Sequence, residues 1–519
     1  MSSFESLVRS ATVGLGARPL DREALPPRIA RTLSHPADGD ALPRGGAGRD
    51  AALALDAAAA YALVHRVGIE SAATTAVTLP SSSRQPVPDR LSSLLSTLMA
   101  DAGQHSLLCA VLRFVRDRGM AVAPRQAAAL LGGHIRRGYD ELVLGVMDER
   151  AAAALADHPK WGVYARRAAL CGGPFDRDAW DDGDCLGRLF CYRRLRAQDP
   201  RLSREFLTPE TLRKQAADRR AEFVWAIGTG LSPADEPLLE KALEDSKENV
   251  RKAATVMLCR LDGSALVRQA EDAVRRHVTV ERGPMRQTRI ACTPLEPGEI
   301  DARYWLDASL GVPRQFEPTA GRLMKAMICV PTGRWKGLIG ITASEMLQAQ
   351  AAYDGEPMDL EWTLGRAAWN WHDAALAAEL FARDPTNVEM VALMEERRRE
   401  EILLDALESG DTPRISDMAR HMPEAWSPRL SLAVARTIAR HAPTGRSQTA
   451  SAHQARAFHN LSGLLAALPT ACAPEAVPEA LAALDSIAVE GQPAHRLDAA
   501  VKGLALRASF LTIVDQETT

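Results

Sequence analysis

Apolar residues recur at helical spacing through most of this chain, and short polar segments interrupt the pattern. Residues three and four positions apart share one face of an α-helix, so each run predicts a helix with one buried stripe. A clear early run spans residues 91–118, with a stripe of Leu94, Leu95, Leu98, His105, Leu108, Cys109 and Leu112. Interruptions rich in Gly, Pro, Ser and Asp, at residues 36–49, 79–89 and 172–187, predict loops between helices. The pattern predicts an all-α protein.

Residues 232–261 carry the best-specified pattern, which predicts a helical hairpin. Ser232 followed by Pro233 is typical of a helix start, because Pro loses nothing by lacking an amide hydrogen in the first turn. The first helix is expected to run to Glu244, where the next two residues turn the chain. The second helix then has one apolar stripe at helical spacing, formed by Val250, Ala253, Ala254, Met257, Leu258 and Leu261.

This hairpin resembles a HEAT repeat. The details that carry the resemblance are Asp245, the pair Val250 and Arg251, and the small residues Ala253 and Ala254 where repeat helices approach closely. In HEAT repeats the Asp and the Arg, six residues apart, form a hydrogen-bonding ladder along the stack, so the resemblance implies structural roles for Asp245 and Arg251. Helical patterns at residues 186–200 and from residue 208 indicate a preceding unit. We expect a third unit, because isolated repeats bury too little surface.

A longer stretch is similar to an uncharacterised bacterial family. Residues 180–200 and the segments GLSPADEPLLEKALED, VRKAA and LDGSAL within residues 230–266 carry the similarity, and residues 7–20 and 53–68 extend it. Members of that family are often encoded beside MoxR-type AAA+ ATPases and von Willebrand A-domain proteins. The resemblance therefore implies a protein partner of one of these kinds. Residues 299–318 differ from the family's Trp-rich segment, so no partner site is carried over to them.

Three regions follow from these patterns. We predict an N-terminal helical region at residues 1–159, HEAT-like helical pairs at residues 160–282 and a C-terminal helical region at residues 283–519. Residues 278–297 have alternating and Pro-rich character, which indicates an extended crossover near the second boundary.

Composition narrows the range of partners and compartments. The chain has 519 residues with 5% aromatics, and 63 Lys and Arg against 66 Asp and Glu give a net charge of −3. No overall basic field gathers nucleic acid or an anionic membrane, so we expect neither as a partner. Eight cysteines without paired spacing are typical of a reducing compartment, and no signal peptide or membrane span is evident. A cytoplasmic location is expected.

Templates for catalysis and cofactor binding do not fit this sequence. The acidic segment at residues 176–184 fails the EF-hand frame, because Trp180 and Leu189 stand where oxygen ligands are needed. Residues 14–19 and 333–340 contain glycines but lack complete phosphate-binding motifs, and no nucleophile or metalloprotease signature is present. Zinc spacing is absent from the nearby cysteines Cys171, Cys185 and Cys191. We therefore predict no enzyme activity, no cofactor and no metal.

Two features leave alternatives open. Trp362, Trp369 and Trp371 could anchor a partner, although helical spacing also favours a place in the core. A basic group, interleaved with Asp218 and Glu222, could contact phosphates on a helical-repeat surface, as in HEAT-like DNA glycosylases. Its members are Arg213, Lys214, Arg219 and Arg220.

Stacked helical pairs present extended surfaces for recognition, and this favours a non-catalytic scaffold or adaptor that binds other proteins. The candidate recognition residues lie on the second helix of the hairpin, opposite its apolar stripe, and are Lys247, Glu248, Lys252 and Thr255. The three tryptophans are the second choice. A helical-repeat protein that binds nucleic acid is the alternative function.

Overall fold

The computed structural model describes residues 79–133, 139–172, 175, 177–283, 287–296, 298–304, 310, 320–442, 452–485, 487 and 492–518. The chain divides into two compact units, Met1–Leu79 and Pro80–Thr519, and the described helices and strands belong to the second unit. The features predicted at residues 7–20, 14–19 and 53–68, and most of residues 299–318, lie outside the described residues. The region boundaries near residues 159 and 282 stay predictions.

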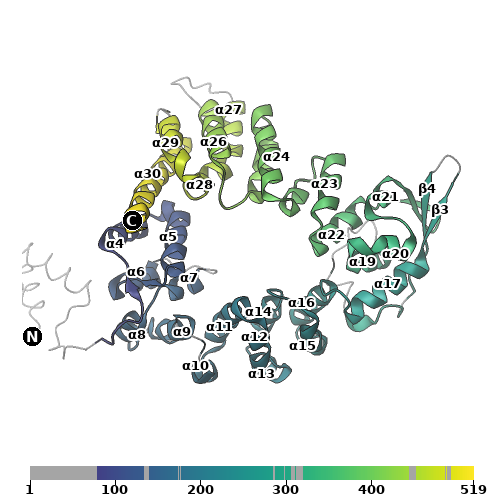
Figure 1. Ribbon diagram of the computed structural model, residues 1–519, viewed down its shortest axis with the longest axis horizontal. Coiled ribbons are helices and arrows are strands. Elements are labelled where there is room, and N and C mark those ends of the chain that lie inside the picture. Colours follow the sequence, from purple (N-terminus) through teal and green to yellow (C-terminus); the bar gives the residue numbers. More distant parts are fainter. Residues whose placement is uncertain are drawn as a thin grey trace, which may run out of the picture. The chain divides into compact units, whose positions relative to one another are not determined.

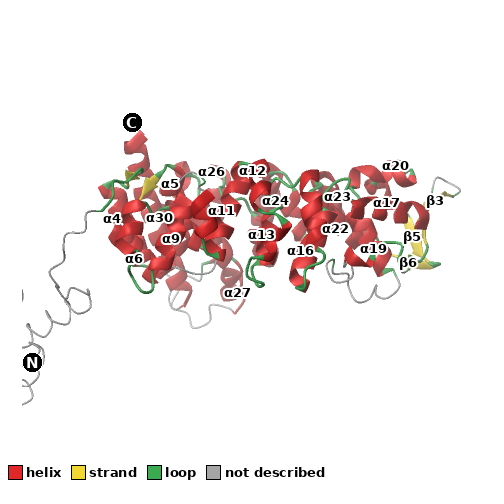
Figure 2. Cartoon of the chain, turned by 90° about the horizontal axis from the view of Figure 1, so that it is seen from below, coloured by secondary structure: helices red, strands yellow, loops and turns green. Residues whose placement is uncertain are grey.

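The second unit is built mainly of α-helices, which confirms the all-α prediction (Figure 2). The helices of its first half are α4 (Asp89–Met99), η1 (Ala102–Gln104), α5 (His105–Asp117), α6 (Pro124–Gly133), α7 (Asp140–Gly145), α8 (Glu149–Leu155), α9 (Gly162–Gly172), α10 (Arg177–Asp182), α11 (Cys185–Gln198), α12 (Pro200–Phe206), α13 (Pro209–Arg213), α14 (Arg220–Ala226), η2 (Pro233–Asp235), α15 (Glu236–Ala242), α16 (Glu248–Cys259) and α17 (Ala265–His277). Those of the second half are η4 (Ala302–Tyr304), α19 (Gly321–Cys329), η6 (Thr332–Arg334), α20 (Trp335–Ile339), α21 (Ala343–Gln348), α22 (Glu361–Trp371), α23 (Ala374–Arg383), η7 (Val388–Leu393), α24 (Glu396–Ser409), α25 (Thr412–Met418), η8 (Ala419–His421), α26 (Pro428–His441), α27 (Ala452–Asn460), α28 (Ser462–Ala471), η9 (Pro474–Ala476), α29 (Val477–Asp485) and α30 (Gln492–Thr518).

Short strands accompany the helices. The strands β1 (Gln85–Pro86) and β2 (Met120–Ala121) form a parallel pair. A four-stranded sheet has the order β3 (Val278–Arg282), β4 (Thr288–Cys292), β5 (Gln350–Tyr353) and β6 (Glu356–Met358). The extended crossover predicted at residues 278–297 is in fact an antiparallel hairpin, with Val278 opposite Cys292. The sequence did not predict β5, because Gln-Ala-Ala-Tyr has no alternation of apolar and polar residues.

The long helix expected at residues 91–118 is two helices. The first ends at Met99, and the side chain of Asp101 caps the start of η1 by accepting a hydrogen bond from the amide of Gly103. The predicted apolar stripe is buried on both sides of this break, except His105, which is half-buried. The periodicity therefore identified the buried face correctly and missed the break, since apolar residues recur at helical spacing on both sides of it.

Helices contact chiefly their neighbours along the chain. Contacts run from α11 to α14, α16, α17, α19, α22 and α23 in turn (Figure 1). The last helix, α30, packs against α4 and α5, so the end of this array is joined to the first described helices. Lys502 pairs with Asp101 at 2.6 Å, and the rings of Phe510 and Phe114 meet edge to face at 5.2 Å between centroids.

Two clusters of buried side chains form the core. One comprises apolar residues of α4 to α9 together with Phe190 of α11, and partly buried residues of α30 pack against it. The other runs from Trp180 to Leu504 and joins the helical pairs, the sheet and the C-terminal helices. Leu186 packs against both clusters, so α11 connects them.

Within the described residues, no helix combines the length and the apolar character needed to span a bilayer.

Candidate protein-interaction surface

The predicted helical hairpin is present as α15 and α16. The two helices are in contact, and Val250, Ala253 and Ala254 are fully buried, as the stripe predicted. Small side chains at the two alanine positions let neighbouring helices approach closely, because no bulky group separates their backbones. The hairpin thus holds the start of α16, with its charged residues, at a fixed position.

Asp245, at the turn of this hairpin, is tied to the preceding helix. Arg220 of α14 donates from Nε and Nη2 to the two carboxylate oxygens at 2.7 and 2.9 Å. Burial by itself raises the pKa of Asp245, but the hydrogen bonds from Arg220 and from the Lys247 amide outweigh it and leave the pKa below its usual value. Such a bidentate pair fixes both the distance and the orientation of the hairpin turn relative to α14.

Arg251 contacts the same turn in a different way from that expected. Its Nη1 donates to the main-chain oxygen of Asp245 at 2.6 Å, while the Asp245 carboxylate binds Arg220. Both predicted residues therefore lie in the polar contacts of the hairpin turn. The partner of the carboxylate is an arginine of the preceding helix, which sequence spacing within one hairpin does not reveal.

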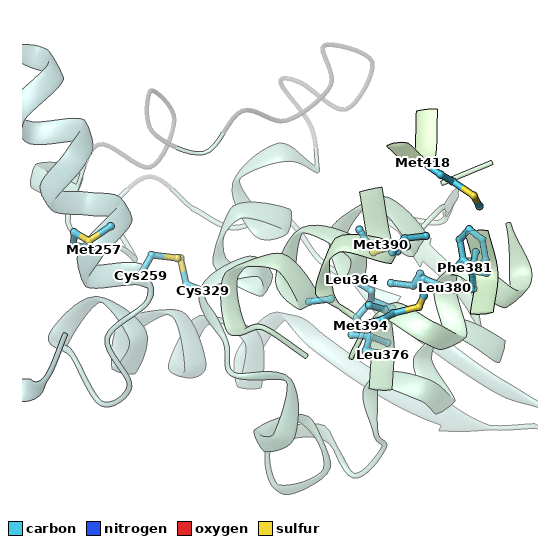
Figure 3. Close-up of a cluster of buried hydrophobic side chains, with 14 of the residues drawn as sticks. Met257, Cys259, Cys329, Leu364, Leu376, Leu380, Phe381, Met390, Met394 and Met418 are labelled. Atoms are coloured by element: carbon cyan, nitrogen blue, oxygen red, sulfur yellow. The ribbon is translucent and has the colours of Figure 1, made fainter. Parts of the chain in front are cut away.

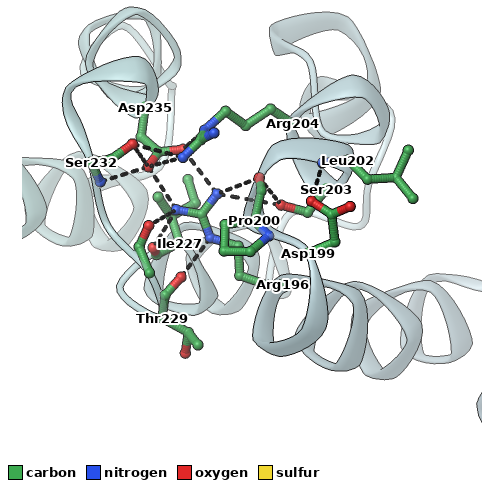
Figure 4. Close-up of polar contacts among 11 residues, drawn as sticks. Arg196, Asp199, Pro200, Leu202, Ser203, Arg204, Ile227, Thr229, Ser232 and Asp235 are labelled. Carbon is green, nitrogen blue, oxygen red and sulfur yellow. Dashed lines mark hydrogen bonds and ion pairs between the residues drawn. The ribbon is translucent and has the colours of Figure 1, made fainter.

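A second polar cluster fixes α11, α12 and η2 to one another (Figure 4). Arg196 has a fully buried side chain and donates from Nη2 to Asp235 at 2.6 Å and from Nη1 at 3.0 Å. Arg204 donates to the same carboxylate from Nε at 2.8 Å. Main-chain oxygens satisfy further guanidinium donors, and they belong to Pro200, Ile227, Thr229 and Gly230. This cluster makes the helices beside the hairpin a rigid support.

A cleft of about 360 Å³ lies between α13 and α15, beside the hairpin turn. Its rim carries the exposed charges of Arg213, Lys241 and Glu244, and Asp245 also lines it. The predicted recognition residues Lys247 and Glu248 are exposed just beyond this turn.

The other predicted recognition residues on α16 divide into two kinds. Lys252 is half-buried and pairs with Glu248 at 2.7 Å, one helical turn away. Thr255 is fully buried, and its hydroxyl donates to the main-chain oxygen of Tyr304. The expectation that Thr255 faces a partner is wrong, because η4 covers that side of α16.

A second cleft, of about 460 Å³, has an excess of acidic groups. We call it the acidic cleft, and its lining residues are Asp140, Glu141, Leu186, Phe190, Arg193, Asp218, Arg219 and Glu222. The lining has four carboxylates and two guanidinium groups. Glu222 forms ion pairs with both arginines, at 2.6 Å from Arg219 and 3.3 Å from Arg193. The acidic cleft therefore has more negative than positive charge.

Two carboxylates of the acidic cleft are poorly compensated. Asp140 and Glu141 both have raised pKa values, because burial disfavours the charged form more than the nearby arginines favour it. One oxygen of Asp140 is buried and has no hydrogen-bond partner among the described residues. Glu141 is 3.9 Å from Arg193, at the outer limit of an ion pair. A cationic group entering the acidic cleft would compensate the charge of both carboxylates.

An exposed tryptophan lies one helical turn from Glu222, a residue of this cleft. Trp225 of α14 is the one large hydrophobic residue among those described that is exposed, with a relative accessible surface of 46%. It follows Glu222 by three positions, so both side chains share one face of α14. No local sequence pattern marks Trp225, Asp140 or Glu141, because the cleft forms only where residues about 40 to 80 positions apart in the chain meet.

The basic group that suggested phosphate contacts is largely engaged within the protein. Arg219 pairs with Glu222, Arg220 pairs with Asp245, and Arg213 lies 3.7 Å from Glu210. Each pairing lowers the positive potential that a phosphate backbone would meet. This part of the helical array therefore offers little net positive charge.

The three tryptophans of α22 are mainly packing residues. Trp362 and Trp369 are half-buried and pack against the larger core cluster. Trp371 is also half-buried, and its Nε1 donates to the main-chain oxygen of Ile328 at 3.2 Å. These contacts favour a place in the core for the three tryptophans over a role as partner anchors.

A family model described as a family of unknown function (DUF5691) matches residues 6–513. No curated protein and no solved structure matches the chain. In the part of the chain that the structure describes, no group of three or more His, Cys, Asp and Glu side chains is placed to hold a metal ion.

Proposed function

This chain belongs to the DUF5691 family of unknown function, and we propose that it is a non-catalytic helical-repeat scaffold that binds another protein. The observation that carries the proposal is the acidic cleft together with Trp225, one helical turn from its Glu222. A HEAT-like arrangement of α11 to α16 is part of the proposal. Its support is the neighbour-to-neighbour contact of these helices and the polar ties at Asp235 and Asp245.

Charge and shape favour a basic segment of the partner as the occupant. An Arg or Lys side chain can place its aliphatic stem on Leu186 and Phe190, and its cationic head near Asp140 and Glu141. A further cation can stack on the exposed ring of Trp225, and exposed tryptophans often anchor protein interfaces. The exposed start of α16, at Lys247 and Glu248, extends the proposed surface and takes the second place in it.

A MoxR-type AAA+ ATPase or a von Willebrand A-domain protein is the partner class that the family resemblance implies. The direct test mixes the full chain with such a protein and follows co-elution by size-exclusion chromatography. Affinity purification of the tagged full chain from its own cells, followed by mass spectrometry, identifies the partner without that assumption. Recovery of one protein at constant ratio supports the scaffold, whereas turnover of a small substrate by the chain alone contradicts it.

Variants locate the surface once a partner is in hand. We expect Trp225→Ala, and separately Asp218→Lys, to weaken binding at least about tenfold, the loss typical of an interface anchor. Arg397→Glu, on the exposed face of α24, is the matched charge-reversal control, since its side chain is 91% exposed. Unchanged affinity in both cleft variants would move the interface elsewhere. Salt-sensitive DNA binding without any protein partner would favour the nucleic-acid alternative.

A further inference from the structure

Two buried thiols meet where α16, α19 and α22 come together (Figure 3). Cys259 is the last residue of α16 and Cys329 is the last residue of α19. Their sulfur atoms are 2.9 Å apart, and both residues are fully buried. The two cysteines are 70 positions apart in the sequence, so only the fold brings them together.

Hydrogen bonds from α22 fix the ends of both helices around the thiols. Asn370 donates from Nδ2 to the main-chain oxygen of Cys259 at 3.0 Å and to that of Ile328 at 3.4 Å. Trp371 donates from Nε1 to the same Ile328 oxygen at 3.2 Å. The main chain next to each cysteine is therefore held by a third helix. This support maintains the short distance between the sulfur atoms.

We propose that Cys259 and Cys329 form an oxidation site, at which an intramolecular disulfide closes across the α16–α19 junction. A disulfide bond measures about 2.05 Å, so the sulfur atoms need to approach by only about 0.9 Å. Side-chain adjustments of that size do not require the helices to separate. Neither cleft contributes to this site, so the site is independent of the proposed partner binding.

Hydrogen peroxide is the oxidant in this reaction. The sulfur of one cysteine, after losing its proton, attacks a peroxide oxygen, so that a sulfenic acid forms and one water leaves. The second sulfur then attacks the sulfenic sulfur, the S–S bond forms, and the hydroxyl leaves as a second water. Both thiol protons end in water. Two electrons pass from the two sulfurs to the O–O bond, which breaks.

Burial makes this site slow to react and slow to reverse. Burial is the main cause that raises the pKa of Cys329 well above its usual value, and the neighbouring thiol of Cys259 raises it further. The thiolate that attacks peroxide is therefore scarce, and oxidation has to proceed through transient opening of the junction. The same burial protects the finished disulfide from soluble thiols. The device is a lasting cross-link between the helical pairs and α19, not a rapid sensor.

Peptide mapping tests the proposal on the full-length protein. The protein is incubated with hydrogen peroxide, denatured in acid, alkylated and digested with trypsin without reduction. The expected product joins the peptide of residues 253–260 to that of residues 326–334, and reduction separates them. Hydrogen exchange should also slow at the C-terminal ends of α16 and α19 after oxidation, because a cross-link suppresses local opening.

Matched variants separate this pair from other buried cysteines. Cys329→Ala should abolish the linked peptide, whereas Cys292→Ala, which removes a buried cysteine of β4, should leave it unchanged. Should Cys329→Ala fail to fold, the peptide map of the wild-type protein still decides. Recovery of both peptides in fully alkylated form after prolonged exposure to peroxide would overturn the proposal. So would cross-links distributed among several cysteine pairs.

Discussion

Replacing Asp235 with Asn removes the negative charge from an enclosed ion pair. The side chain of Asp235 is 1% exposed and that of its partner Arg196 is 0% exposed. An Asn amide keeps the size of the carboxyl group, but its NH₂ group cannot accept the hydrogen bonds that Arg196 and Arg204 donate. The change therefore leaves a guanidinium buried without its counter-charge.

The expected cost follows from this burial. Removing one partner of a buried ion pair destabilises a protein by about 3–5 kcal/mol. Four main-chain oxygens continue to bind the Arg196 guanidinium, so we expect the lower end, about 3 kcal/mol. Asp417→Asn is the matched control, because Asp417 and Arg420 are both exposed and such pairs contribute about 0–1 kcal/mol.

The pH dependence of stability provides a second test of the Asp235 carboxylate. Burial alone raises the pKa of Asp235, but hydrogen bonds from Arg196 and Arg204 outweigh it, so the folded-state pKa lies below the usual value. A lowered pKa means that the carboxylate stabilises the fold above its unfolded pKa. That contribution is lost as the pH falls through the folded pKa. In Asp235→Asn, this part of the acid dependence should be absent.

Hydrogen exchange is the suitable assay, because a long helical array need not unfold in one step. Loss of protection in α11, α12 and α15 reports the local free energy of opening, and urea unfolding followed by circular dichroism reports the whole. Equal protection in Asp235→Asn and Asp417→Asn would refute the reasoning.

Three further changes test other contacts. Arg220→Ala leaves the nearly buried Asp245 carboxylate without its bidentate donor and should cost about 1–3 kcal/mol in thermal denaturation; an unchanged melting temperature would show that this tie is dispensable. Thr255→Val keeps the side-chain shape but removes the donor to the Tyr304 oxygen and should cost about 1–3 kcal/mol in urea unfolding; full stability would contradict burial of that group. Phe510→Ala should destabilise the packing of α30 by about 2 kcal/mol, below the 3–5 kcal/mol expected for a fully buried Phe, because Phe510 is only half-buried. Limited proteolysis of α30 should accelerate, and an unchanged rate would contradict this packing.

Parts of the candidate surface were predictable and parts were not. Lys247 and Glu248 were expected to be exposed from their place on the predicted hairpin, and they are. Thr255 followed from the same helical wheel and was misplaced, because a helix that packs on two sides has no free face opposite its main stripe. A single-helix pattern cannot show that residues from η4, some 50 positions later, cover it.

The sequence alone determined the helices, the buried stripes and the hairpin of α15 and α16, because these features depend on residues close together in the chain. Helical periodicity depends on residues three and four apart, and a turn signal depends on neighbours, so both are readable along the chain. Contacts between distant segments were decided only by the tertiary structure. These include the Arg220 partner of Asp245, the acidic cleft, the meeting of Cys259 with Cys329 and the packing of α30 on α4. Each depends on where whole helices pack, and helix packing is set by the summed fit of many side chains that no local pattern records.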